Sequence, residues 1–388
     1  MKKSKTIYFL GAGFSKDAGG QVQTDISKTL MCDAFKEYVE LKRPGYGKFV
    51  DELHAFLFEE LCVSTESFDY LALEDIFTPI DRCISNGLSF GRYSLMRLVR
   101  FRERLHNLLS YAIQYGVDCF EKVDTHYIPL FAKYIDLLAQ RRVADVSDDR
   151  VAVITTNWDV QLDNALNKVM HDGMGNLNAL GVRNNALDVG NNALGVVDYC
   201  CFMNSLGQPH YATPGLLALG QGGYTVKLLK LHGSLNWLHC PLCNRLYVMD
   251  ESMTLFGRHS CRHCAENYSL KKENASIRLQ HNLLLPTFLK NLNNIQIQLV
   301  WQNAGIELSE ATKIVFMGYS LPAADFEIRQ LLSRYLRKDV EVEVVLFPDS
   351  GSLHEQESRY RGFFGNRISQ VIVDTVPNYI HSMISRFC

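Results

Sequence analysis

The sequence predicts an α/β protein whose core is a doubly wound parallel sheet. Short apolar runs recur along the 388-residue chain, bounded by glycine or polar turns, and stretches with helical periodicity separate them. Such strands, apolar on both faces and alternating with helices, are typical of a parallel sheet that lies between two helical layers. The strong runs are residues 6–13, 150–157, 311–320 and 340–350. The weaker runs are residues 225–233, 282–288 and 369–375.

A long helical segment interrupts this core after the first strand. Residues 25–148 have helical periodicity, because apolar residues such as Leu95, Leu98 and Val99 recur at three- and four-residue steps. The chain therefore divides into a Rossmann-like core, residues 1–24 and 149–388, and a helical insertion, residues 25–148.

Residues 178–198 contain an internal repeat: "NALGVRN", "NALDVGN" and "NALGVVD". The copies are short, and their glycines and valines make poor helix material. We expect a surface loop, residues 174–198, without catalytic residues.

Composition limits the classes of partner and the compartment. The net charge of −2 gives no general attraction to nucleic acid, so any contact with nucleic acid would be indirect. No apolar run reaches the length of about eighteen residues that a membrane span needs. The chain has eleven cysteines, most of them single or, once, adjacent. Free thiols in a reducing cytoplasm are the preferred interpretation.

Four cysteines form a patterned cluster within residues 238–268. Cys240 and Cys243 are separated by two residues, as are Cys261 and Cys264, and seventeen residues lie between the pairs. This spacing is typical of a four-thiolate zinc ribbon, with the intervening stretch forming a hairpin. Four protein ligands leave no open position, so the expected zinc is structural and His232 is not needed as a ligand.

Polar or glycine residues follow three of the expected strands, at the edge where parallel sheets build their sites. The "GAGFS" of residues 11–15 is either a phosphate-binding loop or a tight strand–helix turn. In "TTNWD", residues 155–159, the side chains either form a site or cap the next helix, with Asp159 as the N-cap. His232, in "LHGS", is either a proton acceptor or a structural histidine.

Taken in order, these motifs resemble the sirtuin superfamily. "GAGFS" is similar to its glycine-rich loop, "TTNWD" to "TQNID", and "LHGS" to its catalytic "HG" turn; the four cysteines and "FMGYSLPAAD", residues 316–325, follow as they do in the family. The chain departs from the family in three places. It lacks the Phe-Arg pair after the first motif, it has "LLLPTFLKN", residues 283–291, in place of the segment that grips acyl-lysine, and it carries the helical insertion. These features resemble the NAD-consuming, sirtuin-like proteins of prokaryotic antiviral defence.

The resemblance implies hydrolysis of NAD⁺ to nicotinamide and ADP-ribose, as an NADase. Asn157 would orient water or a ribose hydroxyl, His232 would accept a proton, and Asp159 would hold the nicotinamide amide. The residues expected to bind NAD⁺ are Gly11, Ala12, Gly13, Phe14, Ser15, Thr156, Gly318, Tyr319, Ser320, Pro348 and Asp349.

Three alternatives remain open. An NAD-dependent deacylase would need a channel for acyl-lysine, a non-catalytic subunit would sense NAD⁺ or ADP-ribose, and a nuclease acting in a partner complex would need a metal-binding carboxylate cluster, which is not evident. The resemblance also implies control by homo-oligomerisation or by a HerA-type hexameric motor ATPase, with the helical insertion as the contact surface.

Overall fold

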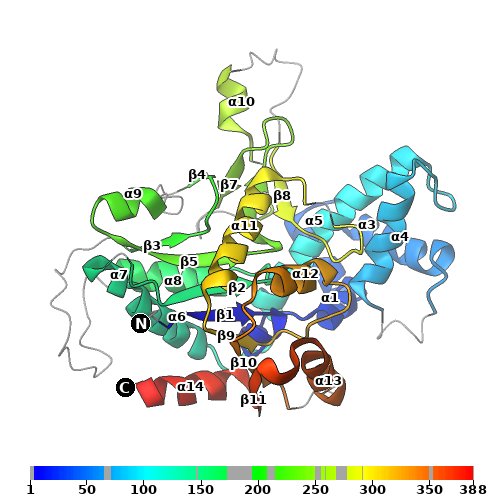
Figure 1. Ribbon diagram of the computed structural model, residues 1–388. Helices are drawn as coiled ribbons and strands as arrows, with labels where there is room; N and C mark the ends of the chain where they lie inside the picture. Colours follow the sequence, from blue (N-terminus) through cyan, green and yellow to red (C-terminus); the bar gives the residue numbers. More distant parts are fainter. Residues whose placement is uncertain are drawn as a thin grey trace.

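The computed structural model describes most of the chain (Figure 1). The described residues are 4–64, 71–145, 147–172, 195–207, 215–249, 255–257, 259–267, 278–290, 292–348 and 353–387. Most of the internal repeat and Asp349 lie outside them. No helix among the described residues combines the length and the apolar character that crossing a membrane requires.

The core is a seven-stranded parallel sheet, which confirms the predicted fold class. Its order is β11-β10-β9-β1-β2-β5-β3, and each neighbouring pair is parallel. The strands are β1 (Thr6–Leu10), β2 (Val151–Thr155), β3 (Gly195–Asp198), β5 (Tyr224–Lys230), β9 (Lys313–Met317), β10 (Glu341–Leu346) and β11 (Ile368–Val373). Strands β2, β5 and β3 lie on one side of β1, and strands β9, β10 and β11 lie on the other side. The strand order therefore reverses between β1 and β9, where open parallel sheets form their crevice.

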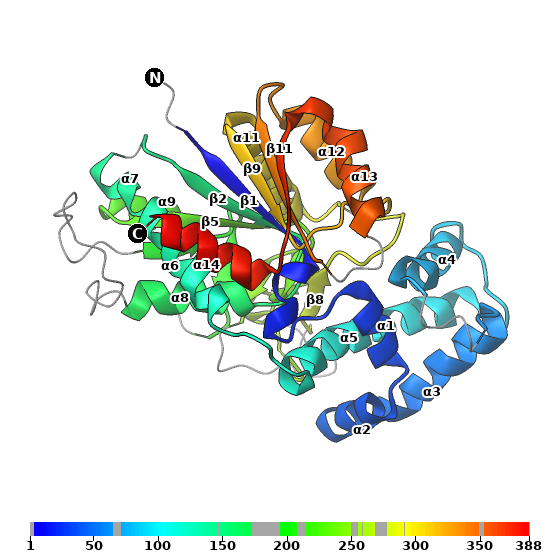
Figure 2. The ribbon, with the colours of Figure 1, turned by 90° about the horizontal axis from the view of Figure 1, so that it is seen from below.

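Helices cover both faces of the sheet (Figure 2). On one face, the Phe131 ring of α6 packs edge-on against Tyr8 of β1, with 5.3 Å between ring centroids. On the other face, Tyr360 of α13 lies 5.3 Å from Phe316 of β9. The first layer contains α6 (Tyr127–Ala139), α8 (Gln161–Asp172) and α14 (Val376–Phe387), and the second contains α11 (Ile295–Glu310), α12 (Phe326–Tyr335) and α13 (Leu353–Phe364). Helix α6 lies within the segment predicted as the insertion, but its apolar side chains belong to the core of the sheet.

The helices of that segment before α6 have a hydrophobic cluster of their own, at the right of Figure 1. They are α1 (Gln23–Leu30), α2 (Asp33–Lys42), α3 (Gly47–Ala55), α4 (Leu73–Ser85) and the long α5 (Leu95–Cys119). The cluster is rich in aromatic side chains, among them the fully buried Phe49 and Phe56. Leu235 and Leu283 from a second sheet complete it, so the helical layer is fastened to the rest of the chain by apolar contact.

That second sheet has four strands in the order β4-β7-β6-β8. The strands are β4 (Met203–Ser205), β6 (Gly233–His239), β7 (Leu246–Val248) and β8 (Gln280–Leu283). The weak run 282–288 was expected to belong to the parallel sheet, but β8 pairs antiparallel with β6 instead. The end of the predicted loop 174–198 also differs, because Val196 and Val197 are buried in β3, which pairs with β5. The described residues also form the short helices α7 (Arg141–Ala144), α9 (Gly215–Gly220) and α10 (Arg262–Asn267). Single turns of 3-10 or π helix lie at Ala12–Phe14, Lys16–Ala18, Phe56–Glu60 and Gly365–Arg367.

Candidate functional site

A cavity of about 510 Å³ lies where the carboxyl ends of β1, β2, β5 and β9 meet. This is the edge at which the strand order reverses. Of the residues predicted from the sequence, those that line the cavity are Ala12, Gly13, Thr156, Asn157, Asp159, His232, Gly318, Tyr319 and Ser320. The structure therefore brings together residues that are as far apart in the chain as Ala12 and Ser320.

The first wall is made by two loops that pack backbone against backbone. The Gly11 N–H donates to the Met317 carbonyl at 3.0 Å, and the Gly13 N–H donates to the Gly318 carbonyl at 2.9 Å. A Cβ on Gly11 would lie 2.5 Å from the Gly318 carbonyl oxygen. Gly318 itself has a φ of +63°, in the left-handed region, and a Cβ there would lie 2.2 Å from the Phe14 nitrogen. The glycines are thus required by the contact between the loops after β1 and β9.

Phe14 was predicted to contact the ligand, but its side chain does not line the cavity. It is 1 % exposed and packs against Tyr127 and Phe131, with 5.9 and 5.4 Å between ring centroids. The Tyr127 hydroxyl also donates to the Phe14 carbonyl at 2.6 Å. An aromatic ring is apolar enough to enter the core at this point, so Phe14 anchors the loop rather than facing the cavity.

Asn157 follows β2 and presents an unpaired carbonyl oxygen. Its side-chain Nδ2 donates to the hydroxyl of the buried Ser15 at 3.3 Å, and its backbone N–H donates to the Thr155 hydroxyl at 3.0 Å. Its Oδ1 is buried and has no hydrogen-bond partner among the described residues. A buried polar atom without a partner is costly, so this oxygen is suited to accept a hydrogen bond from a ligand.

Asp159 fits both of its sequence interpretations. It lines the cavity, and its Oδ1 also accepts from the Gln161 N–H at 3.1 Å, at the first residue of α8. Burial raises the pKa of this carboxyl above its ordinary value, although Lys230 and hydrogen bonds from Gln161 and Ser15 oppose the shift. The buried Lys230 stabilises the same loop, because its Nζ donates to the Asp159 carbonyl at 2.6 Å.

His232 sits on a turn that only glycine allows. It follows β5, and the next residue, Gly233, has a φ of +76° and would place a Cβ 2.0 Å from the Asn282 carbonyl oxygen. The Leu284 N–H donates to the His232 carbonyl at 2.9 Å. Burial lowers the pKa of the imidazole to about 4, with the charge of Asp325 raising it and that of Lys290 lowering it further. The ring is therefore neutral near pH 7 and able to accept a proton.

Two charged residues beside His232 were not predicted. Asp325 Oδ1 lies 3.8 Å from His232 Nε2 and accepts from Lys290 Nζ at 3.0 Å, while Oδ2 accepts from the Tyr319 hydroxyl at 2.9 Å. Burial would raise the pKa of Asp325, but His232, Lys290 and the hydrogen bonds from Lys290 and Tyr319 lower it overall. The signal for Asp325 was its place at the end of "FMGYSLPAAD". No pattern in the sequence connects Lys290 to the site.

Basic residues line another part of the cavity and were also missed. Arg359 of α13 donates through Nε to the Ser320 carbonyl at 3.2 Å, and the Lys16 ammonium lies 4.9 Å from the centre of the Phe347 ring. Phe347 lines the cavity, whereas the predicted Pro348 is exposed and does not. The predicted contact after β10 is therefore displaced by one residue toward the strand.

Residues of the helical layer also line the cavity. Gln21, Ile26 of α1 and Ile113 of α5 line the cavity, together with Trp158. The Trp158 Nε1 and the Gln21 Oε1 are buried without a hydrogen-bond partner in the described part of the chain. The insertion therefore contributes directly to the shape of the cavity.

The four cysteines come together at a separate place. Cys240 Sγ lies 3.7 Å from Cys264 Sγ, and Cys243 Sγ lies 3.6 Å from Cys261 Sγ. Tetrahedral zinc with bonds of about 2.3 Å would separate its sulfurs by about 3.8 Å, so the four thiols fit that ion. Cys240 and Cys243 lie in the turn of the β6–β7 hairpin. The hairpin expected between the two pairs includes residues 250–254 and 258, which lie outside the described residues. None of the cysteines is among the described residues that line the cavity, in keeping with a structural role.

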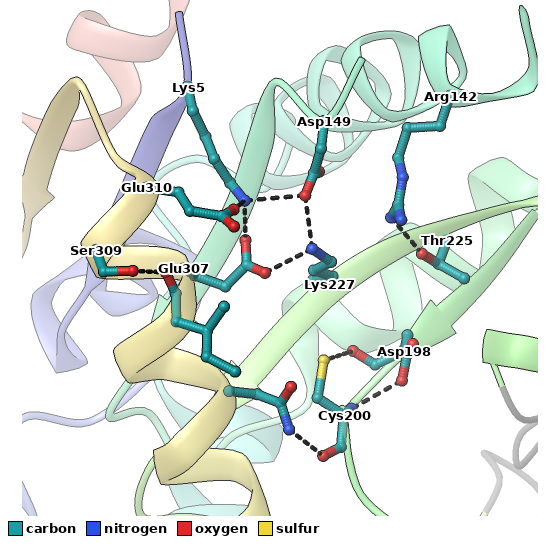
Figure 3. A network of polar contacts seen from close by, with 12 residues as sticks. Lys5, Arg142, Asp149, Asp198, Cys200, Thr225, Lys227, Glu307, Ser309 and Glu310 are labelled. Carbon is teal, nitrogen blue, oxygen red and sulfur yellow. Dashed lines mark hydrogen bonds and ion pairs between the residues drawn. The ribbon is translucent and has the colours of Figure 1, made fainter. Parts of the chain in front are cut away.

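A cluster of acidic residues lies at the opposite edge of the sheet, where the strands begin (Figure 3). Asp149, Glu307 and Glu310 could be grouped around a cation, but lysines already occupy this position. Lys5 Nζ lies 2.9 Å from Asp149 and 2.6 Å from Glu307, and Lys227 pairs with the same two carboxylates. The network neutralises buried charge and ties the start of β1 to β5 and α11.

No protein-family model matches the chain, and no curated protein matches its sequence. Among solved structures it is similar to a Sir2 enzyme, with a TM-score of 0.42, 12% identity, and coverage of 99% of this chain and 92% of that one. It is also similar to a sirtuin studied for substrate affinity, with a TM-score of 0.42, 12% identity, and coverage of 98% and 93%. A third similar structure is a Sir2 homologue variant in complex with ADP-ribose, with a TM-score of 0.38, 12% identity, and coverage of 99% and 92%.

Proposed function

We propose that the chain binds NAD⁺ in the cavity at the carboxyl edge of its parallel sheet and hydrolyses the bond between nicotinamide and ribose. The observation that carries the proposal is the pairing of Asn157 and His232 in one cavity. Asn157 presents a buried oxygen that has no hydrogen-bond partner among the described residues, and the His232 imidazole lines the same cavity beside the glycine loops after β1 and β9. The volume of about 510 Å³ is within the range of about 300 to 1,000 Å³ that is usual for small-molecule sites.

The reaction needs little acid catalysis, because nicotinamide leaves as a neutral molecule. The C1′–N bond breaks, the water oxygen bonds to C1′, and the water gives up one proton, so that NAD⁺ and water yield nicotinamide, ADP-ribose and H⁺. The transition state resembles an oxocarbenium ion, as in other glycoside cleavages. The protein's task is to hold the two parts of the substrate, to aim the water and to take its proton.

Asn157 and His232 divide these tasks according to their hydrogen bonds. Asn157 Nδ2 is engaged by Ser15, so its free Oδ1 accepts an O–H from the water or from a ribose hydroxyl. Neutral His232 accepts the proton, a step typically worth about 10² to 10⁴-fold in rate. Asp159 lines the same cavity and would contact the nicotinamide amide.

The pyrophosphate would lie against the glycine loops, between cations. The backbone of Ala12 and Gly13 lines one side, and Gly318 and Ser320 line the other. Lys16 and Arg359 line the same cavity and supply positive charge in a chain that lacks the Phe-Arg pair of the sirtuins. Arginine suits this role because its guanidinium stays charged and donates charge-assisted hydrogen bonds to phosphate oxygens.

NAD-dependent deacylation is the second candidate, because it begins with cleavage of the same bond. It requires acyl-lysine to reach the ribose beside His232. In this chain residues 283–290 pack against His232: Leu284 bonds to its carbonyl, Pro286 lines the cavity, and Lys290 is held by Asp325. This packing supports hydrolysis. A purely sensing subunit would need neither Asn157 nor His232.

The wider role is proposed on the sequence resemblance alone. NAD⁺ depletion in prokaryotic antiviral defence requires restraint of the enzyme until infection, through self-assembly or a HerA-type ATPase. The helical layer of α1–α5 is the proposed contact surface for that control, and the four-cysteine module is proposed to hold structural zinc.

The test is nicotinamide release from NAD⁺ by the purified chain and by Asn157→Ala and His232→Ala. We expect release by the wild type and loss in both variants, with unchanged circular dichroism. His354→Ala, an exposed histidine outside the cavity lining, is the matched control. Release that requires an added acyl-lysine peptide would support the deacylase. Tight ADP-ribose binding by calorimetry without any release, even with a partner supplied, would support a sensing role.

A further inference from the structure

We infer that Asp325 is a positioning residue for His232. Asp325 orients the imidazole so that Nε2 points at the Asp325 carboxylate and Nδ1 is left to accept the proton. The positive charge of Lys290 partly offsets the negative charge that Asp325 presents to the ring. The inference rests on the proposed hydrolysis for its kinetic consequence, but the orientation of the ring can be tested without it.

The Asp325 carboxylate is held in place before any substrate binds. The Tyr319 hydroxyl donates to Oδ2 at 2.9 Å and Lys290 Nζ donates to Oδ1 at 3.0 Å. Lys290 also donates to the Ala324 carbonyl at 2.7 Å, which fixes the backbone next to Asp325. The Asp325 side chain is 11 % exposed, so water does not screen its charge effectively.

The contact with His232 is long in the resting state and is suited to shorten when the ring gains a proton. Nε2 is 3.8 Å from Oδ1, and it has no other hydrogen-bond partner among the described residues. A buried imidazolium is unstable unless an opposite charge lies beside it. Catalytic hydrogen bonds are often long in the free enzyme and tighten as charge develops.

Two charges of opposite sign act on His232. Asp325, in the loop before α12, favours the protonated ring, and Lys290, in the loop after β8, disfavours it. From the loop after β2, Asn157 and Trp158 are uncharged, and Asp159 lines the same cavity while bonded to the start of α8. The base strength of His232 is therefore set by the balance between one carboxylate and one ammonium group.

The backbone leading to Asp325 shows that its position is imposed by the loop. Leu321 has a φ of +51°, an uncommon conformation for a bulky residue, and it is fully buried. Arg329 stabilises this turn by donating from Nη2 to the Leu321 carbonyl at 2.6 Å. Strain of this kind concentrates at functional sites, where surrounding contacts hold it. Here it directs the chain from the cavity wall at Gly318 back to His232.

The kinetic test compares the pH dependence of kcat in three variants. The active form of His232 is neutral, so kcat falls on the acid side as the ring is protonated. Asp325→Asn should move this acid limb to lower pH and reduce the plateau about 10- to 100-fold, less than the loss of a proton acceptor itself. Lys290→Gln should move the limb in the opposite direction. Asp325→Glu, which restores the charge, should recover the position of the limb.

Glu327→Gln is the matched control. Glu327 is the other carboxylate partner of Lys290, at 3.3 Å, but it does not line the cavity. Its loss disturbs Lys290 without removing the charge that faces His232, so the limb should stay in place. Limbs that do not move in Asp325→Asn and Lys290→Gln, or that move in the same direction, would overturn the inference.

The ring orientation is tested by ¹⁵N chemical shifts of histidine-labelled wild type at pH 7, assigned with His232→Gln. A neutral ring with its proton on Nε2 is expected. A proton on Nδ1 would overturn the inference whether or not NAD⁺ is hydrolysed. If the expected tautomer is found but no nicotinamide is released, the hydrolase fails and the pairing of His232 with Asp325 stands.

Discussion

Replacing Gly233 by alanine tests whether the turn that carries His232 depends on the absence of a side chain. Gly233 has a φ of +76°, and its Cβ would lie 2.0 Å from the Asn282 carbonyl oxygen, 3.1 Å from the Asn282 carbonyl carbon and 3.4 Å from Leu283 Cα. These atoms belong to the backbone of β8, which pairs with β6 in the register Gly233 to Leu283. The strand cannot retreat from the new methyl group without breaking that pairing.

The expected loss of stability has two parts that can be estimated separately. A left-handed conformation costs an alanine about 1–2 kcal/mol relative to glycine. Forcing a methyl group into a packed backbone adds about 1–3 kcal/mol. Gly45 has a φ of +91° with no atom within 4 Å of its Cβ position. Gly45→Ala is therefore expected to lose only the stability that the left-handed conformation costs. Gly220 has neither the positive φ nor a close neighbour, and Gly220→Ala is expected to be near neutral.

Urea denaturation of the three variants, followed by fluorescence, gives the comparison. We expect the unfolding free energy to fall in the order Gly220→Ala, Gly45→Ala, Gly233→Ala. Gly233→Ala alone should also lower nicotinamide release, because the turn displaces His232. Equal losses for Gly45→Ala and Gly233→Ala would show that β8 yields to the methyl group and would refute the steric argument.

Other predictions concern the metal, the pH dependence and the substrate. Elemental analysis should find one zinc per chain in the wild type and none in Cys243→Ser, whose melting temperature should fall because metal binding is coupled to folding; zinc-free wild type would contradict this. Burial raises the pKa of Asp136 to about 6, so its folded state binds a proton more readily than the unfolded state. The unfolding free energy of wild type relative to Asp136→Asn should therefore rise by about 2 kcal/mol as the pH falls through 6 toward 4; a difference that stays constant with pH would contradict a raised pKa for Asp136. Arg359→Ala and Lys16→Ala should raise the KM for NAD⁺ with a smaller effect on kcat, and a loss confined to kcat would place these cations elsewhere.

The parallel sheet was predictable because its strands carry their own signal. Residues 151–154 and 314–317 are apolar throughout and are followed by polar or glycine turns, and both runs are buried in the strands that they form. The second sheet has no such signal. Strand β6 reads "GSLNWLH", with polar residues that are nonetheless buried between β7, β8 and the helical layer. Its burial comes from packing partners far away in the sequence, and residue pattern alone cannot reveal it.

The sequence predicted the site residues that follow strands, but it did not predict those that reach the site through longer loops. Asn157 and His232 follow strands directly, and the geometry of a parallel sheet brings such positions to one edge. Asp325 and Lys290 reach the same place through loops whose paths depend on tertiary contacts, including the left-handed turn at Leu321. Lys290 lies within a segment of mixed apolar and polar character, and only its ion pair with Asp325 shows its connection to the site.

The glycines of the first motif illustrate why a motif and a ligand site must be argued separately. "GAGFS" allowed either a phosphate-binding loop or a tight turn. The close approach of Gly11 and Gly13 to Gly318 accounts for all three glycines without any ligand, because two strand-end loops must touch where the strand order reverses. The case for a ligand rests instead on Asn157 Oδ1, which is buried without a hydrogen-bond partner among the described residues, and on the His232 imidazole in the same cavity. The packing of the glycine loops forms the crevice, and the Asn157 amide and the His232 imidazole are the groups proposed to act on the substrate. Asn157→Ala or His232→Ala should therefore abolish turnover while the glycine loops and the fold remain intact.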